Sequence, residues 1–212
     1  MMSRQAPPPS LWRADKPLLL ASRSGARQAL LRGAGIPFEV MAADVDERAI
    51  EARLLAAAAP PGERAMALAG AKALAIANLR PGRTVVGADQ ILALGTEGLH
   101  KPVDRAAAAR QLTLLSGKTH VLQAGVAVAM DGRILFEATA AARMSMRPLS
   151  PAFIEAYLGL MGEAAFANVG SYEFEGLGIQ LFGEVDGDYA TILGMPLLPL
   201  LAFLRSQEWL LA

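Results

Sequence analysis

The stretch Leu18–Leu31, LLLASRSGARQALL, reads as a buried strand, a turn of small residues and an amphipathic helix in direct succession. Its first four residues are apolar without polar alternation, which is typical of a strand covered on both faces. Ser22 and Ser24 offer hydroxyls and backbone N–H groups at the start of the helix, and Arg27 adds a cation, so the turn suits an anion such as phosphate. Taken alone, the turn slightly favours a simpler interpretation, in which Ser24 only caps the helix and Arg27 is solvated.

Composition bounds the class of protein. The chain has 212 residues, of which 53% are hydrophobic and 19% charged, as in a compact soluble protein. Its 20 basic and 20 acidic side chains balance, so no basic excess favours a nucleic-acid partner. The absence of cysteine excludes disulfides, thiolate zinc sites and a cysteine nucleophile. The presence of only two histidines disfavours a multi-histidine metal site.

The ends of the chain carry no sign of a membrane segment. Residues 1–16 contain a proline run and lack the apolar core of a secretory signal, so we expect a flexible tail there and one domain with two lobes over residues 17–212. The longest apolar run, Ile192–Leu204, contains two prolines and is shorter than the roughly 20 residues of a membrane span. We expect a cytoplasmic protein with neither membrane nor nucleic acid as partner.

Acidic and basic side chains stand out at several positions. Asp44, Asp46 and Glu47 follow the strand expected over residues 38–42, and they suit either a hard divalent cation or the cap of the next helix. Lys72 is the one lysine of an alanine-rich helix expected over residues 63–79, and most such lysines face solvent.

Asp89 carries the strongest functional signal. It interrupts TVVGADQILAL, residues 84–94, which is the most strand-like segment of the chain. Because an unpaired buried carboxylate is very costly, Asp89 must be paired or exposed at a cleft, and we favour a functional role. Lys101, next to Pro102 in a loop, fits either a positioned cation or an ordinary surface lysine.

The second half of the chain reads mainly as scaffold. Asp131 and Gly132 form the strongest hairpin signal, between strands expected over residues 121–130 and 133–146. His120 precedes them and is interpreted as a structural, hydrogen-bonding histidine. SGKT at 116–119 looks like the end of a phosphate-binding loop, but Leu112 replaces the required first glycine. Because strands alternate with helices up to residue 115 and hairpin strands follow, we expect an α/β fold with a mixed sheet.

Together these side chains suggest one chemistry. Cations that hold a polyphosphate, acids that hold a divalent metal and one acid that orients water are what phosphoanhydride hydrolysis requires. The candidates are Arg27, Lys72 and Lys101 for the cations and Asp46, Glu47 and Asp89 for the acids.

A series of short segments between Leu18 and Leu204 also matches one protein family, in order. The segments are LLLASRSGAR at 18–27, VDE at 45–47, AKA around Lys72, VVGADQ at 85–90, KP at 101–102, LSGKTH at 115–120, GSYEFEGLGIQLF at 170–182, and GDY and GMPL after it. By these segments the chain resembles the Maf family of nucleoside triphosphate pyrophosphatases.

The resemblance implies a two-lobed α/β protein with a central cleft, related to the inosine triphosphatase architecture and commonly a homodimer. It implies cleavage of a nucleoside triphosphate between the α and β phosphates, to a monophosphate and pyrophosphate, with Mg²⁺ or Mn²⁺ as cofactor. Carried over position by position, it assigns Asp89 as the acid that accepts a proton from water and Glu47 as a metal ligand. It assigns phosphate binding to Ser22, Ser24, Arg27, Lys72 and Lys101.

Three further positions bear on the choice of base: Ala26, Gln90 and Glu175. The branch of the family that acts on dTTP and UTP usually has arginine, threonine and glutamine there, and the branch that acts on 7-methyl-GTP usually has tryptophan, glutamine and glutamate. Gln90 and Glu175 therefore indicate the second branch, and a carboxylate suits the N–H donors of a guanine edge. Ala26 departs from that pattern, since it stands where the second branch has tryptophan. Alanine cannot stack on a cationic methylated base as an aromatic ring could.

Two alternatives stay open from the sequence. One is a dTTP/UTP pyrophosphatase of the same family. The other is a nucleotide-binding, division-linked regulator whose hydrolysis is vestigial, although a pure binding protein has no need of a water-orienting acid.

Overall fold

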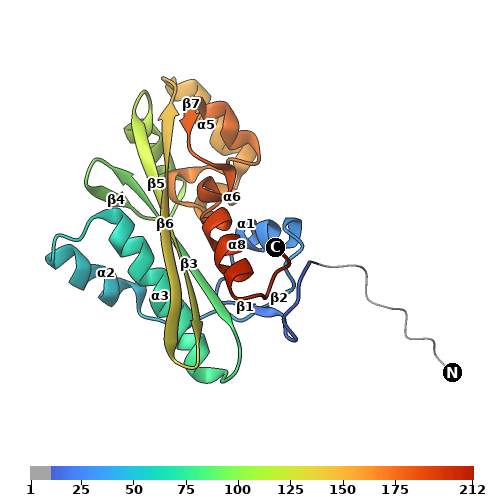
Figure 1. The fold of residues 1–212 in the computed structure, drawn as a ribbon. Helices are drawn as coiled ribbons and strands as arrows, with labels where there is room; N and C mark the ends of the chain where they lie inside the picture. Colours follow the sequence, from blue (N-terminus) through green and yellow to red (C-terminus); the bar gives the residue numbers. More distant parts are fainter. Residues whose placement is uncertain (1–10) are drawn as a thin grey trace.

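A seven-stranded mixed sheet lies at the centre of the protein, in a computed structural model that describes residues 11–212 (Figure 1). The strand order is β2-β1-β3-β5-β6-β7, with β4 paired to β3, and β1 runs parallel to β2 and β3 while the other pairs are antiparallel. The strands are β1 (Leu18–Leu20), β2 (Phe38–Val40), β3 (Val85–Leu94), β4 (Glu97–Leu99), β5 (Thr119–Met130), β6 (Arg133–Met146) and β7 (Phe182–Asp186). The mixed α/β class predicted from the sequence is confirmed.

The helices lie between these strands and at the end of the chain. The α-helices are α1 (Gly25–Gly33), α2 (Glu47–Ala56), α3 (Pro61–Leu79), α4 (Arg105–Leu115), α5 (Pro151–Met161), α6 (Ala164–Ala167), α7 (Tyr189–Ile192) and α8 (Leu197–Ser206). Two short 3-10 helices, Val169–Ser171 and Leu177–Leu181, lie in the glycine-rich segment before β7.

The predicted hairpin joins β5 and β6. Asp131 and Gly132 form its turn with φ values of 49° and 74°, the positive pair that a two-residue hairpin turn requires. The Asp131 carboxylate also accepts a hydrogen bond from the backbone N–H of Gly82 at 2.6 Å, which ties the turn to the loop before β3.

Helix α3 packs on one face of the sheet at very short range. Its residues Ala65, Ala69, Ala73 and Ala77 recur every four positions and are buried, so a stripe of methyl groups faces the strands. The strands meet this stripe with glycine, since a Cβ at Gly87 would lie 2.1 Å from the backbone oxygen of Ala69. In the neighbouring strand β5, a Cβ at Gly125, which pairs with Asp89, would lie 2.7 Å from the backbone of Ala65.

Two separate apolar cores lie on the opposite face of the sheet. One packs α1 and α8 on β1 and the first halves of β3 and β6, and the other packs α4, α5 and α7 on the far ends of β3, β5 and β6. Figure 1 shows α2 and α3 on one side of the sheet and α1, α5, α6 and α8 on the other. Both cores lie on the same continuous sheet, and the division of residues 17–212 into two lobes stays a prediction.

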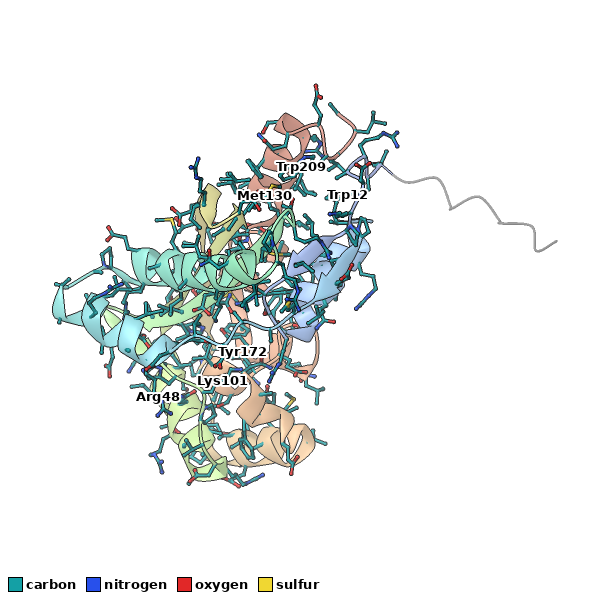
Figure 2. The ribbon with its side chains drawn as sticks, turned by 90° about the horizontal axis from the view of Figure 1, so that it is seen from below. Trp12, Arg48, Lys101, Met130, Tyr172 and Trp209 are labelled. Atoms are coloured by element: carbon teal, nitrogen blue, oxygen red, sulfur yellow. The ribbon has the colours of Figure 1, made fainter. Side chains whose placement is uncertain are left out.

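The two ends of the described chain lie together. Trp12 forms an isolated antiparallel bridge with Leu210, and the backbone N–H of Arg13 donates to the oxygen of Trp209 at 2.9 Å. Figure 2 shows Trp12 and Trp209 at the same edge of the molecule. This part of the predicted flexible tail is therefore attached to the body of the protein, while residues 1–10 of that tail lie outside the described residues. Over residues 11–212, every helix is too short or too polar to cross a bilayer.

His120 lies in the second core and is structural, as predicted. Its side chain is 0% exposed, and Nε2 pairs with the Tyr172 hydroxyl at 2.8 Å. Burial lowers the pKa of His120 to about 4, because the imidazolium form loses its hydration there.

A pH-dependent stability follows from His120. Since the pKa is about 4 in the folded protein and 6.5 as its reference value, the contribution to stability is complete above pH 6.5 and is lost as the pH falls towards 4. We expect a loss of roughly 3 kcal/mol in the free energy of unfolding from this residue. Urea denaturation at pH 7 and pH 4.5 measures it, with His120→Gln as comparison. An equal loss in the variant would contradict the assignment.

Candidate active site

A gap along one edge of β3 creates the main cavity. On that edge β1 pairs only with Val85 and Val86, and β4 pairs from Leu92 onward. Among residues 11–212, no strand pairs with the stretch between them on this side, so the carboxyl end of β1 faces an open strand edge. A cavity of about 840 Å³ opens there, which is in the size range of small-molecule sites.

All ten residues that the family resemblance assigns line this one cavity, whereas the further candidate Asp46 does not. They come from the β1–α1 turn, α1, α2, α3, β3, the loop after β4 and the segment before β7, which are widely separated along the chain. They are Ser22, Ser24, Ala26, Arg27, Glu47, Lys72, Asp89, Gln90, Lys101 and Glu175. The cavity brings them together, and the role of each stays a prediction.

The β1–α1 turn caps α1 and also lines the cavity, so it has features of both the helix cap and the anion site that the sequence suggested. Ser24 caps α1, since its Oγ accepts from the backbone N–H of Arg27 at 3.4 Å. Ser22, which is 8% exposed, accepts at its Oγ from the backbone N–H of Ser24 at 3.2 Å. The turn is therefore held by its own serines at the wall of the cavity, with the N-terminus of a nine-residue helix directed to it.

Arg27 joins the turn to two distant segments. Its Nη1 donates to Ser22 Oγ at 3.1 Å and to the oxygen of Ala88 at 2.7 Å, which satisfies a carbonyl at the open edge of β3. Its Nε donates to the oxygen of Gly194 at 2.9 Å. Burial lowers the pKa of Arg27 below its usual value, although the carboxylates of Asp89 and Glu47 act in the opposite direction. Arg27 still carries its charge, because a guanidinium group does not lose its proton in proteins. Among the described residues, its Nη2 makes no hydrogen bond to the backbone, so this nitrogen is left for a ligand.

Lys72 does not face solvent, and this is the main departure from the simple interpretation of α3. Its side chain is 11% exposed, and Nζ lies 2.5 Å from Asp89 Oδ1 and 3.0 Å from Glu47 Oε1. The contact depends on Gly87, because this glycine and Asp89 lie on the same face of β3 and α3 rests directly on it. One ammonium group thus links two carboxylates at the wall of the cavity.

Two neighbouring acidic residues at the start of α2 make different contacts. Asp46 caps the helix, because its Oδ1 accepts from the backbone N–H of Ala49 at 3.0 Å. Glu47, the next residue, reaches into the cavity and contacts Lys72. The cap that the sequence left open is therefore confirmed for Asp46, and metal binding by Glu47 stays a prediction.

The donor set around Lys72 suits a divalent cation that also binds substrate. Among the described residues, no group of three or more acidic, histidine or cysteine side chains is arranged to enclose a metal ion. Mg²⁺, however, is commonly held by one or two carboxylates together with substrate phosphates and water. Asp89 and Glu47, which contact the same ammonium from two sides, provide such a pair.

Gln90 and Glu175, two of the residues linked to base choice, line the cavity where α7 meets the segment before β7, and we call this part the base end. Gln90 donates both hydrogens of its amide to the backbone oxygens of Thr191 and Ile192, at 2.9 and 3.0 Å. Its remaining polar atom, Oε1, is an acceptor. Ala26 lines the cavity without an aromatic ring, and Glu175 is exposed at its wall.

Comparison with known proteins identifies the family of this chain. The family model of Maf-like proteins matches residues 17–207. The chain belongs to the Maf family. It is 55% identical over 202 residues to a nucleoside triphosphate pyrophosphatase of Rhodopseudomonas palustris, which covers 95% of this chain and 98% of the relative. It is 51% identical over 191 residues to a 7-methyl-GTP pyrophosphatase of Brucella abortus, covering 90% and 96%.

Among solved structures, a dITP/XTP pyrophosphatase of Mycobacterium abscessus aligns with 91% of this Maf chain and 95% of its own, at 14% identity and a TM-score of 0.38. A similarity of this size supports no conclusion about fold or activity, so the relation to the inosine triphosphatase architecture stays an expectation.

Several residues of the Maf cavity were not found from the sequence. Asn168, Tyr172 and Glu173 line it from the segment after α5, and Glu51 and His100 line it near Lys101. Only Glu173 had a signal, as one of two carboxylates among aromatic residues in a glycine-rich stretch.

Proposed function

We propose that this protein hydrolyses nucleoside triphosphates between the α and β phosphates, releasing a nucleoside monophosphate and pyrophosphate. The observation that carries the proposal is the placement of Lys72 between Asp89 and Glu47 at the wall of the cavity. A buried ammonium beside two acids gives one site the charges needed to bind phosphates and to activate water. The family relatives named above support the same reaction.

Each side chain has a role in this proposal. The triphosphate lies against the β1–α1 turn, where Ser22, Ser24 and Nη2 of Arg27 donate hydrogen bonds, and Lys101, which lines the same cavity, adds a cation. Lys72 binds Oδ1 of Asp89, so Oδ2 is the oxygen that accepts the proton from the attacking water.

A divalent cation, Mg²⁺ or Mn²⁺, is part of the proposal. When bound by Glu47 and Asp89 it supplies charge that neutralises the phosphate oxygens. Lys72, which contacts both carboxylates, would contribute a further positive charge beside the bound phosphates.

For the base, we propose a modified guanine nucleotide of the 7-methyl-GTP type. Gln90 and Glu175 present acceptors to the base end, and such acceptors suit guanine N–H donors while they repel the carbonyls of thymine and uracil. The 7-methyl-GTP pyrophosphatase of Brucella abortus, at 51% identity, supports this choice. A preference for dTTP or UTP is the alternative.

We also propose that the protein is a homodimer, as its resemblance to the family implies.

A panel of nucleotides tests the activity and the base preference together. The full chain is incubated with 7-methyl-GTP, GTP, ITP, CTP, UTP and dTTP, with Mg²⁺, with Mn²⁺ and with chelator, and the nucleotide products are separated. We expect monophosphates, a dependence on metal and the highest kcat/KM for a guanine nucleotide. Highest turnover of dTTP or UTP would favour the alternative, while nucleotide binding without any turnover would indicate the vestigial regulator.

A further inference from the structure

A second carboxylate, that of Glu173, lies at the base end of the cavity and is held in place. Its Oε1 accepts a hydrogen bond from Nδ2 of Asn168 at 3.2 Å, and both residues line the cavity. Glu173 is half-buried, whereas Glu175 is exposed. Between these two acids, Glu173 is therefore the one whose position is defined by the protein.

The backbone around Glu173 is equally well defined. Its carbonyl oxygen accepts from the N–H groups of Gly176 and Gly178, both at 3.1 Å. A Cβ at Gly178 would lie 2.4 Å from that oxygen, so only glycine permits the turn. On the other side, Tyr172 is anchored by its hydroxyl to the buried His120 at 2.8 Å. The segment thus presents Glu173 from a fixed backbone.

The polar groups at this end of the cavity are mainly acceptors. The amide hydrogens of Gln90 are used by backbone oxygens, and the amide of Asn168 donates to Glu173. The acceptors left for a ligand are Oε1 of Gln90, the second oxygen of Glu173 and the exposed carboxylate of Glu175, and apolar residues such as Phe174 and Ile192 also line the cavity. In such surroundings a hydrogen bond is worth more than in water, and a mismatched polar group costs more.

We propose that Glu173, positioned by Asn168, is a specificity-determining residue that accepts hydrogen bonds from the N1–H and 2-amino groups of a guanine-type base. The inference rests on the proposed function, because it assumes that the base of a nucleoside triphosphate occupies this end of the cavity. A carboxylate matches two adjacent N–H donors, which guanine has on its Watson–Crick edge. Thymine and uracil offer one N–H between two carbonyls, and the carboxylate repels those carbonyls.

The same carboxylate also favours a base with a positive charge. 7-Methylguanine is cationic, and a half-buried anion beside it is screened less than an exposed one. Since Ala26 supplies no aromatic ring for stacking, this electrostatic attraction provides a different means of selecting the methylated base.

Isosteric replacement of the carboxylate tests the proposal. Glu173→Gln keeps the shape and the contact with Asn168 but removes the charge and adds a donor. We expect the ratio of kcat/KM for GTP over that for UTP to fall about 10-fold or more, mainly through KM for GTP, since a good pair of base contacts discriminates by this much. 7-Methyl-GTP should lose at least as much as GTP. Asn168→Ala should shift the ratio in the same direction by less.

Glu184→Gln is the matched control, because Glu184 is an exposed glutamate of β7. It should leave the ratio unchanged, and thermal unfolding should show that all variants are folded. An unchanged ratio in Glu173→Gln, with wild-type turnover of GTP, would overturn the inference and leave the proposed function intact.

A binding measurement separates the inference from the activity. The affinities of α,β-methylene analogues of GTP and UTP, which resist cleavage between those phosphates, are measured by calorimetry for the wild type and Glu173→Gln. We expect the preference for the GTP analogue in the wild type and its loss in the variant. This result is expected even if hydrolysis fails and the proposed function with it. No preference in the wild type would contradict the role of Glu173.

Discussion

Asp89→Asn is expected to lower kcat by a factor of about 10² to 10⁴, the contribution that a positioned general base makes to proton transfer. The amide cannot accept the proton of the attacking water, and Lys72 loses the anionic partner that lies 2.5 Å from its Nζ. At saturating Mg²⁺, substrate binding should change much less, because the β1–α1 turn, Lys101 and the other proposed metal ligand, Glu47, are untouched. Single-turnover rates and nucleotide affinities, measured on the same preparation, separate the two effects.

Asp186→Asn serves as the control for Asp89→Asn, since Asp186 is an exposed aspartate at the end of β7. Its rates should equal those of the wild type. If Asp89→Asn also retained a wild-type kcat, the general base would be a different group and the mechanism proposed for this cavity would be wrong.

Gly87→Ala is expected to reduce both stability and activity although it adds only one methyl group. The new Cβ would lie 2.1 Å from the oxygen of Ala69 and 2.7 Å from the nitrogen of Ala73, so the backbone of α3 must move away from β3. Overpacking of this kind costs about 1–3 kcal/mol of unfolding free energy. Because Lys72 belongs to α3, it moves with the helix, and a displacement of about 1 Å lowers rates on the order of 100-fold.

Denaturant unfolding and kcat are the two readouts for Gly87→Ala. Gly159→Ala is its control, since a Cβ at Gly159 in α5 meets nothing within 4 Å. Alanine within a helix is favoured over glycine by about 1 kcal/mol, so the control should be at least as stable as the wild type. Wild-type stability and rate in Gly87→Ala would mean that the close approach of α3 does not position Lys72.

Much of this fold follows from local patterns. The apolar run 18–21, the alternating hairpin with Asp131 and Gly132, and the alanine-rich helix each determine their own secondary structure, and the structure contains all of them. Their type is local because hydrophobic periodicity and turn chemistry act over a few residues. Among the described residues of the expected tail, residues 11–13 differ from the expectation, because they pair with the far end of the chain.

The site depends on contacts that no local pattern contains. Nothing around Lys72 indicates that the lysine faces inward, because its burial results from glycine residues on two strands that let α3 approach. The hydrogen bond from Arg27 to Gly194 likewise joins residues 167 positions apart. Resemblance to a family assigned roles to Arg27 and Lys72 but not these contacts, whereas Glu173 became a candidate only when the structure placed it beside Asn168 at the base end.

The position of bond cleavage tests the central claim most directly. ³¹P nuclear magnetic resonance of a reaction with GTP or 7-methyl-GTP, in the presence of Mg²⁺, distinguishes the products without a coupling enzyme. The account predicts one pyrophosphate signal for each monophosphate formed, and no diphosphate nucleotide. Orthophosphate together with a nucleoside diphosphate would contradict it, because the water would then have attacked the terminal phosphate.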